Sequence, residues 1–457
     1  MTNNKTGEKM KKGKAGIFTL STSSIIVIEC LISIIMIFLD TFLVSKLLQL
    51  TPGDYTGVAL FNFLYYMMIA LTMIIGNAIL VKMNKGVFMS IGAFLLAMMF
   101  IVVYFLGDNI INWIWLLGIG VGLTYGIFYA GFSALLVEAV SSKNQTIYFS
   151  IKNILIFLTK TIFPLVLGTI ITKSFPAMCI ILAVVSILIF VFSFFVKCNK
   201  GKKRTYNLLK FWRIVREGGE ETKPLKTLYL SGFFRGMCFD LIATVLTILV
   251  FLQSEGNDFT IGLVQTIFTG AQLISMFIFM KAYHKNLAQW FIFVSLGFIT
   301  AGAITVIIKP CLVTVLIFYG IYYFFRLFIT TITDMRKSSV IRTLSMHEHC
   351  LEHNTTYQMA YGPVRALSYL LLCLCLVIPD QQIMVDICLA YNLVGYIGYS
   401  ICLFKLERQL IAQDIKWKKE HPDSNALPAK EENKQMEVIE VAKETPSIEK
   451  EILDSKA

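Results

Sequence analysis

The sequence predicts an all-α integral membrane protein with twelve transmembrane helices arranged in two six-helix bundles. Three observations support this prediction: the composition is very apolar, long apolar segments recur along the chain, and basic residues gather in alternate gaps between them. Hydrophobic residues make up 56% of the chain and charged residues 15%, against about 25% charged in an average soluble domain. A soluble protein of this composition would lack the polar groups to cover its surface, whereas lipid-facing helices need apolar side chains.

Twelve segments are long and apolar enough to cross the hydrocarbon core of a bilayer, which takes about 20 residues. The first, Ile25–Leu48, is too long for the apolar part of a signal peptide, so we expect it to be retained. The predicted spans are 24–48, 56–81, 87–106, 112–139, 147–171, 174–196, 227–252, 259–281, 288–308, 310–333, 356–378 and 381–404.

A polar, basic segment divides these spans into two sets of six. We expect a basic N-terminal segment at 1–23, an N-terminal bundle at 24–196, a linker at 197–226 and a C-terminal bundle at 227–405. Residues 406–457 are rich in Glu, Lys, Ser and Pro and have no core pattern, so they are predicted to form a disordered tail.

Basic residues alternate from gap to gap between the spans, as the positive-inside rule requires. The gaps on the side of the amino terminus hold Lys82 with Lys85, the basic linker, and Arg336 with Lys337. This pattern predicts a multi-pass protein of the cell membrane with both termini in the cytoplasm. It also assigns the net charge of +12 to contacts with lipid headgroups rather than with nucleic acid. The opposite gaps carry acidic residues instead, namely Asp54, Asp108, Glu255, Asp258 and Asp380.

Two further patterns bear on the architecture. Residues 208–216 and 410–419 combine apolar and basic side chains, which predicts helices that lie in the membrane interface. A faint internal repeat relates Gly53–Thr56 to Asn257–Thr260 at an offset of 204 residues, and chance similarity remains the alternative explanation. Two parallel halves of six spans are a known layout of transporters.

Five charged residues lie deep within predicted spans, where a charge is costly and needs a reason. Lys160, Asp240 and Arg326 lie near the middle of the fifth, seventh and tenth spans. Arg365 lies inside the eleventh span, and Asp40 lies in the outer half of the first. Other charged residues rank lower because they lie nearer the ends of the spans: Arg235, Glu29, Glu138, Lys152, Asp334 and Asp386.

Two interpretations of the deep charges stay open. They form internal ion pairs that fasten helices together, or they line a polar cavity that binds a solute. In the second case Asp40 and Asp240 are candidate proton carriers, because burial favours a neutral carboxyl group and a nearby cation favours a charged one. Lys160, Arg326 and Arg365 are candidate ligands for an anionic group. The excess of cations favours an anionic or carboxylate-bearing substrate.

Other patterns carry less specific information. The glycines of the fourth span, such as Gly118 and Gly122, indicate close helix packing or a rocking motion. Aromatic residues around Arg326 form a stacking wall or simply pack. His349 and His353 share a helix face, but the loop has no second cluster of ligands, so we expect no metal site. No phosphate-binding loop and no catalytic set is evident, so we expect no cofactor and no enzymatic activity.

The chain resembles the major facilitator superfamily across residues 20–405 in its six-plus-six spans, its basic middle loop and its predicted cytoplasmic termini. The family's loop between spans two and three corresponds here to residues 76–86. Gly76, Lys82 and Lys85 match its glycine and basic positions, and Leu80 stands where the family has Asp. The resemblance implies that these three residues belong to a gating loop. The Gly-Pro signature of drug antiporters is not matched around Pro164.

The resemblance also implies that spans one, four, seven and ten line a cavity, with five, eight and eleven beside them. We therefore expect a secondary active transporter that moves a small solute, with an anionic one favoured, by alternating access coupled to protons. The expected partners are a small-molecule substrate, the lipid bilayer and protons, and the expected state is a monomer. The alternatives are efflux of amphipathic compounds, a non-transporting receptor or assembly factor on the same scaffold, and, with no catalytic set in view, a membrane enzyme.

Overall fold

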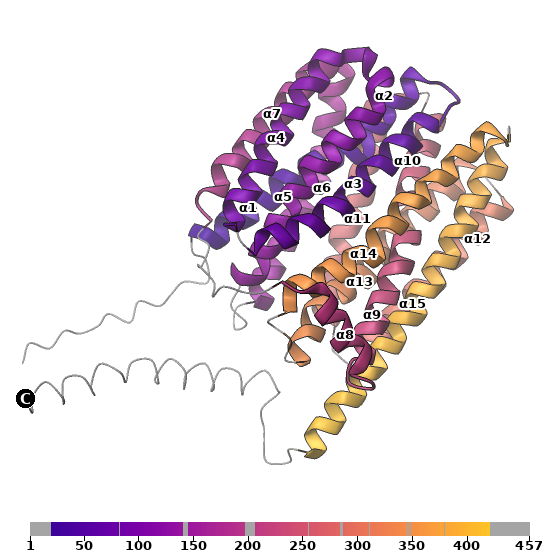
Figure 1. The fold of residues 1–457 in the computed structure, drawn as a ribbon. Coiled ribbons are helices and arrows are strands. Elements are labelled where there is room, and N and C mark those ends of the chain that lie inside the picture. Colours follow the sequence, from indigo (N-terminus) through magenta and orange to yellow (C-terminus); the bar gives the residue numbers. More distant parts are fainter. Residues whose placement is uncertain are drawn as a thin grey trace, which may run out of the picture.

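The computed structural model describes residues 20–81, 83–139, 145–196, 206–254, 256–283, 287–309, 311–344, 346, 349–378 and 380–420. Helices make up nearly all of this part of the chain, and no strand occurs in it. The prediction of an all-α membrane protein is therefore confirmed. Figure 1 shows the long helices running side by side.

The first half of the molecule, which we define as α1 to α7, follows the predicted spans closely. The first span is one rod in three pieces, because a π-helical segment interrupts it at its middle. The elements are α1 (Leu20–Ile37), η1 (Phe38–Phe42), α2 (Leu43–Leu50), α3 (Thr56–Leu80), α4 (Lys85–Leu106), η2 (Gly107–Trp113), α5 (Ile114–Ala139), α6 (Gln145–Lys173) and α7 (Phe175–Ser193).

The second half, α9 to α15, follows a short helix in the linker. Its first span is broken between α9 and α10, at Phe239. The elements are α8 (Leu208–Glu217), α9 (Lys223–Cys238), α10 (Asp240–Gln253), α11 (Asp258–Ala282), α12 (Ala288–Ile308), α13 (Leu312–Thr343), α14 (Cys350–Ser368), η6 (Tyr369–Leu376) and α15 (Gln381–Glu420).

Ten described helical stretches are long and apolar enough to cross a membrane. The number is consistent with twelve crossings. One stretch, Lys85–Leu135, contains both the third and the fourth predicted spans, because η2 joins α4 to α5 without a break. The predicted eleventh span, 356–378, is absent from the ten, since α14 is polar and η6 has 3-10 geometry.

Helix α15 continues well beyond the expected end of the last span at residue 404. The extension has packing partners: Leu406 and Leu410 are buried, and Glu407 accepts two hydrogen bonds from Arg336 of α13 at 2.5 and 2.6 Å. Residues 406–420 are thus helical, and the remainder of the predicted disordered tail lies outside the described residues.

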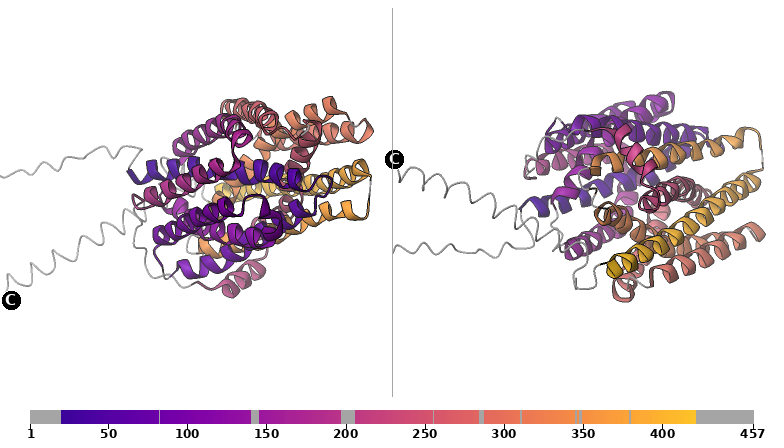
Figure 2. Two further views of the ribbon diagram at one scale, coloured as in Figure 1. Left: turned by 90° about the horizontal axis from the view of Figure 1, so that it is seen from above. Right: turned by 60° about the horizontal axis from the view of Figure 1, so that its bottom comes forward.

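Each half packs mainly within itself, and a few helices join the halves. In the first half α3, α4, α5 and α7 are neighbours, and in the second half α15 packs on α9 and α12 on α13. The halves meet where α3 contacts α14 and where α6 contacts α11. Figures 1 and 2 show the early helices and the late helices on opposite sides of the molecule.

Glycines permit the closest helix contacts. A Cβ atom on Gly122 of α5 would lie 2.5 Å from the carbonyl oxygen of Tyr65 on α3. Between the halves, a Cβ on Gly168 of α6 would lie 2.8 Å from the carbonyl oxygen of Asp258, and one on Gly262 of α11 would lie 2.6 Å from that of Pro164. The structure therefore supports close packing as the use of these glycines.

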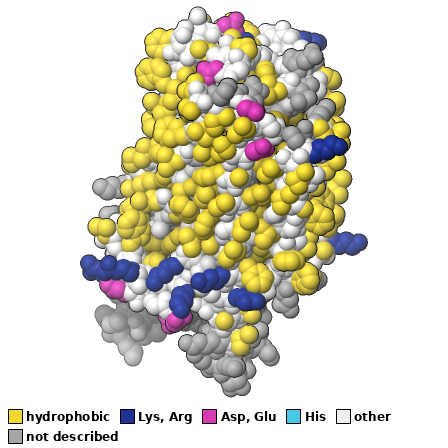
Figure 3. Space-filling model, turned by 90° about the vertical axis from the view of Figure 1, so that its right-hand side faces the viewer, with side chains coloured by type: hydrophobic (Ala, Val, Ile, Leu, Met, Phe, Trp, Pro, Cys, Tyr) yellow, Lys and Arg dark blue, Asp and Glu magenta, His cyan; other side chains and the backbone are white. Residues whose placement is uncertain are grey.

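Helix α8 marks one end of the two bundles, which we call the linker end; the opposite end is the far end. Phe211 and Val215 of α8 are buried, and Trp212 Nε1 donates a hydrogen bond to Thr356 Oγ1 of α14 at 2.9 Å. The predicted interfacial helix is thus docked on α14. In the space-filling view, a broad apolar belt lies above a row of Lys and Arg side chains at the lower end, where some Asp or Glu side chains also lie, and both kinds of charge are scattered in the upper part (Figure 3).

Candidate functional site

Each of the two deep carboxylates lies at an irregularity in the first span of its half. Asp40 lies within the π-helical segment η1, and Asp240 is the first residue of α10 after the break at Phe239. The break is stabilised by Tyr322, whose hydroxyl donates to the carbonyl oxygen of Phe239 at 2.8 Å, and by Asn392, which donates to that of Cys238. Irregular backbone at membrane depth needs such partners, and π segments are frequent at functional sites.

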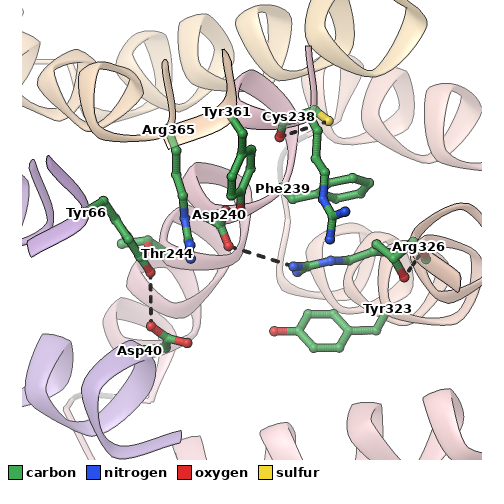
Figure 4. A network of polar contacts seen from close by, with 12 residues as sticks. Asp40, Tyr66, Cys238, Phe239, Asp240, Thr244, Tyr323, Arg326, Tyr361 and Arg365 are labelled. Atoms are coloured by element: carbon green, nitrogen blue, oxygen red, sulfur yellow. Dashed lines mark hydrogen bonds and ion pairs between the residues drawn. The ribbon is translucent and has the colours of Figure 1, made fainter. Parts of the chain in front are cut away.

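Asp240 is the most heavily bonded residue of the group. Its Oδ2 atom lies 2.7 Å from Arg365 Nε and accepts a hydrogen bond from the Tyr361 hydroxyl at 2.9 Å. Its Oδ1 atom lies 3.9 Å from Arg326 Nη2. Figure 4 shows the two arginines approaching this carboxylate from different helices. Asp240 therefore joins α10, α13 and α14.

Aromatic rings hold both guanidinium groups. The Arg326 guanidinium lies 4.9 Å from the ring centre of Phe239, and that of Arg365 lies 3.6 Å from the ring centre of Tyr66. Such cation–π contacts are strongest where water is excluded. Tyr66, on α3 of the first half, also donates a hydrogen bond to Asp40 Oδ1 at 3.1 Å (Figure 4). Tyr66 thereby links the carboxylate of one half to the arginine of the other.

Lys160 on α6 differs from the other four deep charges. Its side chain is half-buried, and it makes no hydrogen bond or ion pair with any residue that the structure describes. Arg326 and Asp40 are nevertheless among the charged groups that act electrostatically on its ammonium group. Lys160 therefore lies within electrostatic reach of these charged groups, and we call the five residues Asp40, Lys160, Asp240, Arg326 and Arg365 the central cluster.

The central cluster has an internal symmetry that matches the two halves. Asp40 and Asp240 are 200 residues apart on the first span of each half, and Lys160 and Arg365 are 205 residues apart on the fifth span of each half. These separations are close to the offset of the sequence repeat. The first span of each half thus carries a carboxylate and the fifth span of each half carries a cation, while Arg326 belongs to the second half alone.

Two ion pairs lie between the central cluster and the linker end. Arg235 Nη1 of α9 lies 3.0 Å from Asp334 Oδ1 of α13, and Lys152 Nζ of α6 lies 2.9 Å from Glu29 Oε1 of α1. The sequence analysis ranked these residues low because they lie nearer the ends of the spans. The structure shows that they pair with each other. The side chain of Glu138 lies outside the described part, and Asp386 bonds locally to Gln382.

Sequence reasoning missed the tyrosines. Tyr66, Tyr361 and Tyr369 contact the cluster or each other at its edge; the rings of Tyr66 and Tyr369 stack at 5.3 Å. A signal for one of them was available: Tyr361 and Arg365 are four residues apart and therefore share a helix face. No such spacing identifies Tyr66, whose partners come from other helices.

The residues proposed for the gating loop are only partly described. Gly76 is buried, and a Cβ atom there would lie 3.1 Å from Ala130 Cβ, so close packing with α5 explains a glycine at this position. Lys85 begins α4, and Lys82 lies outside the described residues. At the far end, Ser45 donates to Asp258 Oδ1 at 2.5 Å and Gln49 donates to Asp258 Oδ2 at 3.0 Å, which joins α2 to the second half.

Two other features form no candidate site among the described residues. The described residues include no group of three or more His, Cys, Asp or Glu side chains placed to hold a metal ion. His353 is buried, with its ring nitrogens near the Tyr229 hydroxyl and the Lys337 carbonyl oxygen. Two shallow grooves, beside Met99 and beside Phe268, are lined by apolar side chains, as expected for surfaces that face lipid acyl chains.

Comparison with known proteins identifies the fold. No curated protein sequence matches the chain. A transporter of the POT family in complex with 5-aminolevulinic acid has a TM-score of 0.62 at 12% identity, over 82% of this chain and 94% of that one. A bacterial homologue of the iron transporter ferroportin, facing outward, has 0.60 at 14% identity, over 86% and 99%. The human organic anion transporter MFSD10 has 0.54 at 11% identity, over 83% and 98%.

These structural similarities show the fold alone, because the identities are low. The family assignment comes from the sequence profile of the Major Facilitator Superfamily, which matches residues 23–374 and so covers more than half of the chain. The resemblance inferred from the sequence is thereby confirmed, and family and fold together indicate a transporter rather than an enzyme. The chain is a multi-pass membrane protein that belongs to the Major Facilitator Superfamily.

Proposed function

We propose that the protein is a secondary active transporter that carries a small, carboxylate-bearing anion across the cell membrane by alternating access, coupled to protons. The observation that carries the proposal is the central cluster, in which three cations and two carboxylates gather at mid-depth. The formal charge of this group is positive when all five residues are ionised. A bound monoanion would neutralise it, which matters in a region of low dielectric constant.

Lys160 is the residue that we assign to the anion. The other cations already have partners, since Arg365 and Arg326 both approach Asp240. An ammonium group at this depth without a bonded partner is costly, and a ligand carboxylate would reduce the cost. Two of the structures similar to this chain are consistent with an acidic substrate: one holds 5-aminolevulinic acid, and another is an organic anion transporter.

Alternating access follows from the distribution of the cluster over both halves. Asp40 and Lys160 come from the first half, and Asp240, Arg326 and Arg365 come from the second. The halves also touch at both ends: Asp258 bonds to Ser45 at the far end, and Asn77 Nδ2 bonds to Thr355 Oγ1 at 3.1 Å at the linker end. Transport would break one set of contacts at a time. By the positive-inside rule, the linker end faces the cytoplasm.

Asp40 is the residue that we assign to the proton. Asp240 is committed to two arginines, whereas the only hydrogen bond described for the Asp40 carboxylate comes from the neutral Tyr66 hydroxyl. Asp40 can therefore gain or lose a proton without breaking an ion pair. Gly76, Lys82 and Lys85 keep their proposed role in the gating loop, by analogy with the family.

Flux measurements test the proposal. In proteoliposomes, uptake of a panel of small radiolabelled carboxylates should be stimulated by an imposed pH gradient. Lys160→Ala should weaken binding of the transported carboxylate tenfold or more, because it removes the cation that has no bonded partner among the described residues. Lys173→Ala, at the exposed end of the same helix, is the matched control and should have no effect. Unchanged affinity in Lys160→Ala would refute the assignment, and binding without flux would favour the receptor alternative.

A further inference from the structure

A second group of charged and aromatic side chains lies between the central cluster and the linker end. Arg235 of α9 is at its centre: its Nη1 atom lies 3.0 Å from Asp334 Oδ1 and donates to the Tyr357 hydroxyl at 3.4 Å. Lys337 Nζ lies 4.7 Å from the ring centre of Tyr357 and donates to Asn354 Oδ1 at 2.8 Å. Two cations thus contact one tyrosine, and the Asp334 carboxylate lies beside Arg235.

The partners in this ion pair are buried to very different extents. The Arg235 side chain is 19% exposed, whereas that of Asp334 is 65% exposed. The guanidinium is therefore largely enclosed by protein, whereas most of the carboxylate side chain is exposed. An exposed carboxylate loses little when it returns to water, so another carboxylate can replace it at low cost.

This group of side chains borders the other half of the molecule. Asn354, which accepts a hydrogen bond from Lys337, donates one to Ser133 Oγ of α5, in the first half, at 3.4 Å. The group therefore lies beside the interface between the halves. In the proposed mechanism, this interface borders the route of a solute between the linker end and the central cluster.

Tyr361 connects this group to the central cluster. Its ring centre lies 5.6 Å from the Arg235 guanidinium and 5.5 Å from that of Arg365, and its hydroxyl bonds to Asp240. One ring is thus in contact with a cation of each group. An anion that leaves Arg235 would meet the next guanidinium on the other side of this ring.

We infer that Arg235, Lys337 and Tyr357 form a second binding subsite for small carboxylates, and that Asp334 occupies it when no ligand is bound. The inference rests on the proposed function and adds an entry or exit station to it. A substrate carboxylate displaces Asp334 from Arg235, where a planar guanidinium can bind it through two parallel hydrogen bonds. The displaced Asp334 returns to solvent.

The decisive experiment removes the competing carboxylate. Thermal unfolding of the purified full-length protein is followed against potassium acetate, with potassium chloride replacing it at constant ionic strength, since a bound ligand stabilises the folded state. Asp334→Asn should bind acetate at least threefold more tightly than wild type. Arg235→Gln should bind it more weakly, and the double variant should lose the gain. Arg235→Lys, which keeps the positive charge but loses the planar guanidinium, should also bind acetate more weakly.

The chain offers a matched control for the ion pair itself. Lys46 Nζ and Asp108 Oδ1 lie 2.7 Å apart, with side chains 19% and 78% exposed. This pair lies away from the site and, like Arg235 and Asp334, joins a mostly buried cation to an exposed carboxylate. Asp108→Asn should leave acetate affinity unchanged. If Asp334→Asn also leaves it unchanged while Lys160→Ala weakens it, the second subsite is refuted and the proposed function stands. If neither wild type nor Asp334→Asn responds to acetate beyond chloride, both are refuted.

Discussion

At the scale of single residues, the members of the central cluster differ in how many partners they have. Asp240 has two arginines and a tyrosine, Asp40 has one tyrosine, and Lys160 has no bonded partner among the described side chains. Groups with many partners hold the helices in place, and removing one leaves the others buried and unpaired. Groups with few partners are free to exchange them. This difference is the basis for our proposal of a transport role for Asp40 and a structural role for Asp240.

Asp40→Asn should abolish the coupling of transport to the pH gradient while leaving substrate exchange intact. The amide keeps a hydrogen-bond acceptor for Tyr66 but takes up no proton. Uptake driven by a pH gradient should fall to the level without a gradient, and counterflow should continue. Asp240→Asn should behave differently and lower both thermal stability and binding, because it leaves two arginines without a carboxylate. Full stimulation by the gradient in Asp40→Asn would exclude this residue as the proton carrier.

At the scale of helices, contacts between backbones determine where side chains can be added. Gly122 of α5 lies against the carbonyl oxygen of Tyr65, so any added carbon collides with the backbone of α3. Tyr65 stacks on Phe61 and neighbours Tyr66. Tyr66 donates a hydrogen bond to Asp40, and its ring contacts the Arg365 guanidinium. A shift of α3 would therefore reach the central cluster.

Gly122→Ala should destabilise the protein by about 1–3 kcal/mol, the usual cost of an extra carbon in a packed interface. Thermal unfolding in detergent measures the change as a lower melting temperature. Gly297→Ala in α12 is the control, since a Cβ atom there meets nothing within 4 Å. It should be neutral or slightly stabilising, because alanine favours helix over glycine. Equal melting temperatures for the two variants would contradict the packing interpretation.

Helix positions were predictable from the sequence where apolar runs end in polar breaks, as between α3 and α4 at Asn84. They were less predictable where the break is itself helical. The segment Gly107–Trp113 continues the third span into the fourth, and α14 spans residues too polar for hydropathy to detect. The π segment at Asp40 and the break at Phe239 left no trace in the apolar pattern, because tertiary hydrogen bonds from Tyr322 and Asn392 stabilise the break.

The deep charged residues of the candidate site could be identified from the sequence, but the contacts between them could not. Depth along each span identified Lys160 and Asp240, since depth needs only the sequence position. Which charges pair depends on how each helix is rotated and tilted, and a single sequence does not determine this. Asp334 shows the difference: it lies near a span end, and only the packing of α13 against α9 brings it to Arg235.

At the scale of the whole molecule, few bonds hold the halves together at the far end. Asp258 alone accepts hydrogen bonds from both Ser45 and Gln49 across the interface, and Gln49 also bonds to the carbonyl oxygen of Gly256. Among the described residues, this carboxylate thus accepts side-chain hydrogen bonds between the halves at the end where α6 also packs on α11. At the linker end, Asn77 and Tyr206 both donate to Thr355 Oγ1, which joins the first half, the linker and the second half.

Asp258→Ala should shift the population toward conformations open at the far end. Hydrogen bonds to charged groups are worth about 1.5–3 kcal/mol, so the balance should change roughly tenfold or more. Spin labels at Pro52 and Leu263, exposed positions in different halves, report the separation in a cysteine-depleted background. The population with longer distances between the two labels should increase. Asp54→Ala, whose carboxylate caps α3 within the first half, is the control. An unchanged distribution would show that Asp258 does not close this end.

The glycine contact between α6 and α11 has a mechanical consequence. Where Gly168 meets Gly262, the two backbones touch without side chains between them, so a turn of one helix on the other needs no repacking at this point, although the helices also contact each other farther along, at Thr161 and Gly270. The contact lies near the far end, and α11 extends from it for roughly 20 residues, or about 30 Å at 1.5 Å per residue. A turn of about 10° about this contact would displace the other tip of the helix by about 5 Å, roughly the rise of one helical turn. Such a turn would therefore move the linker end of α11 more than its far end.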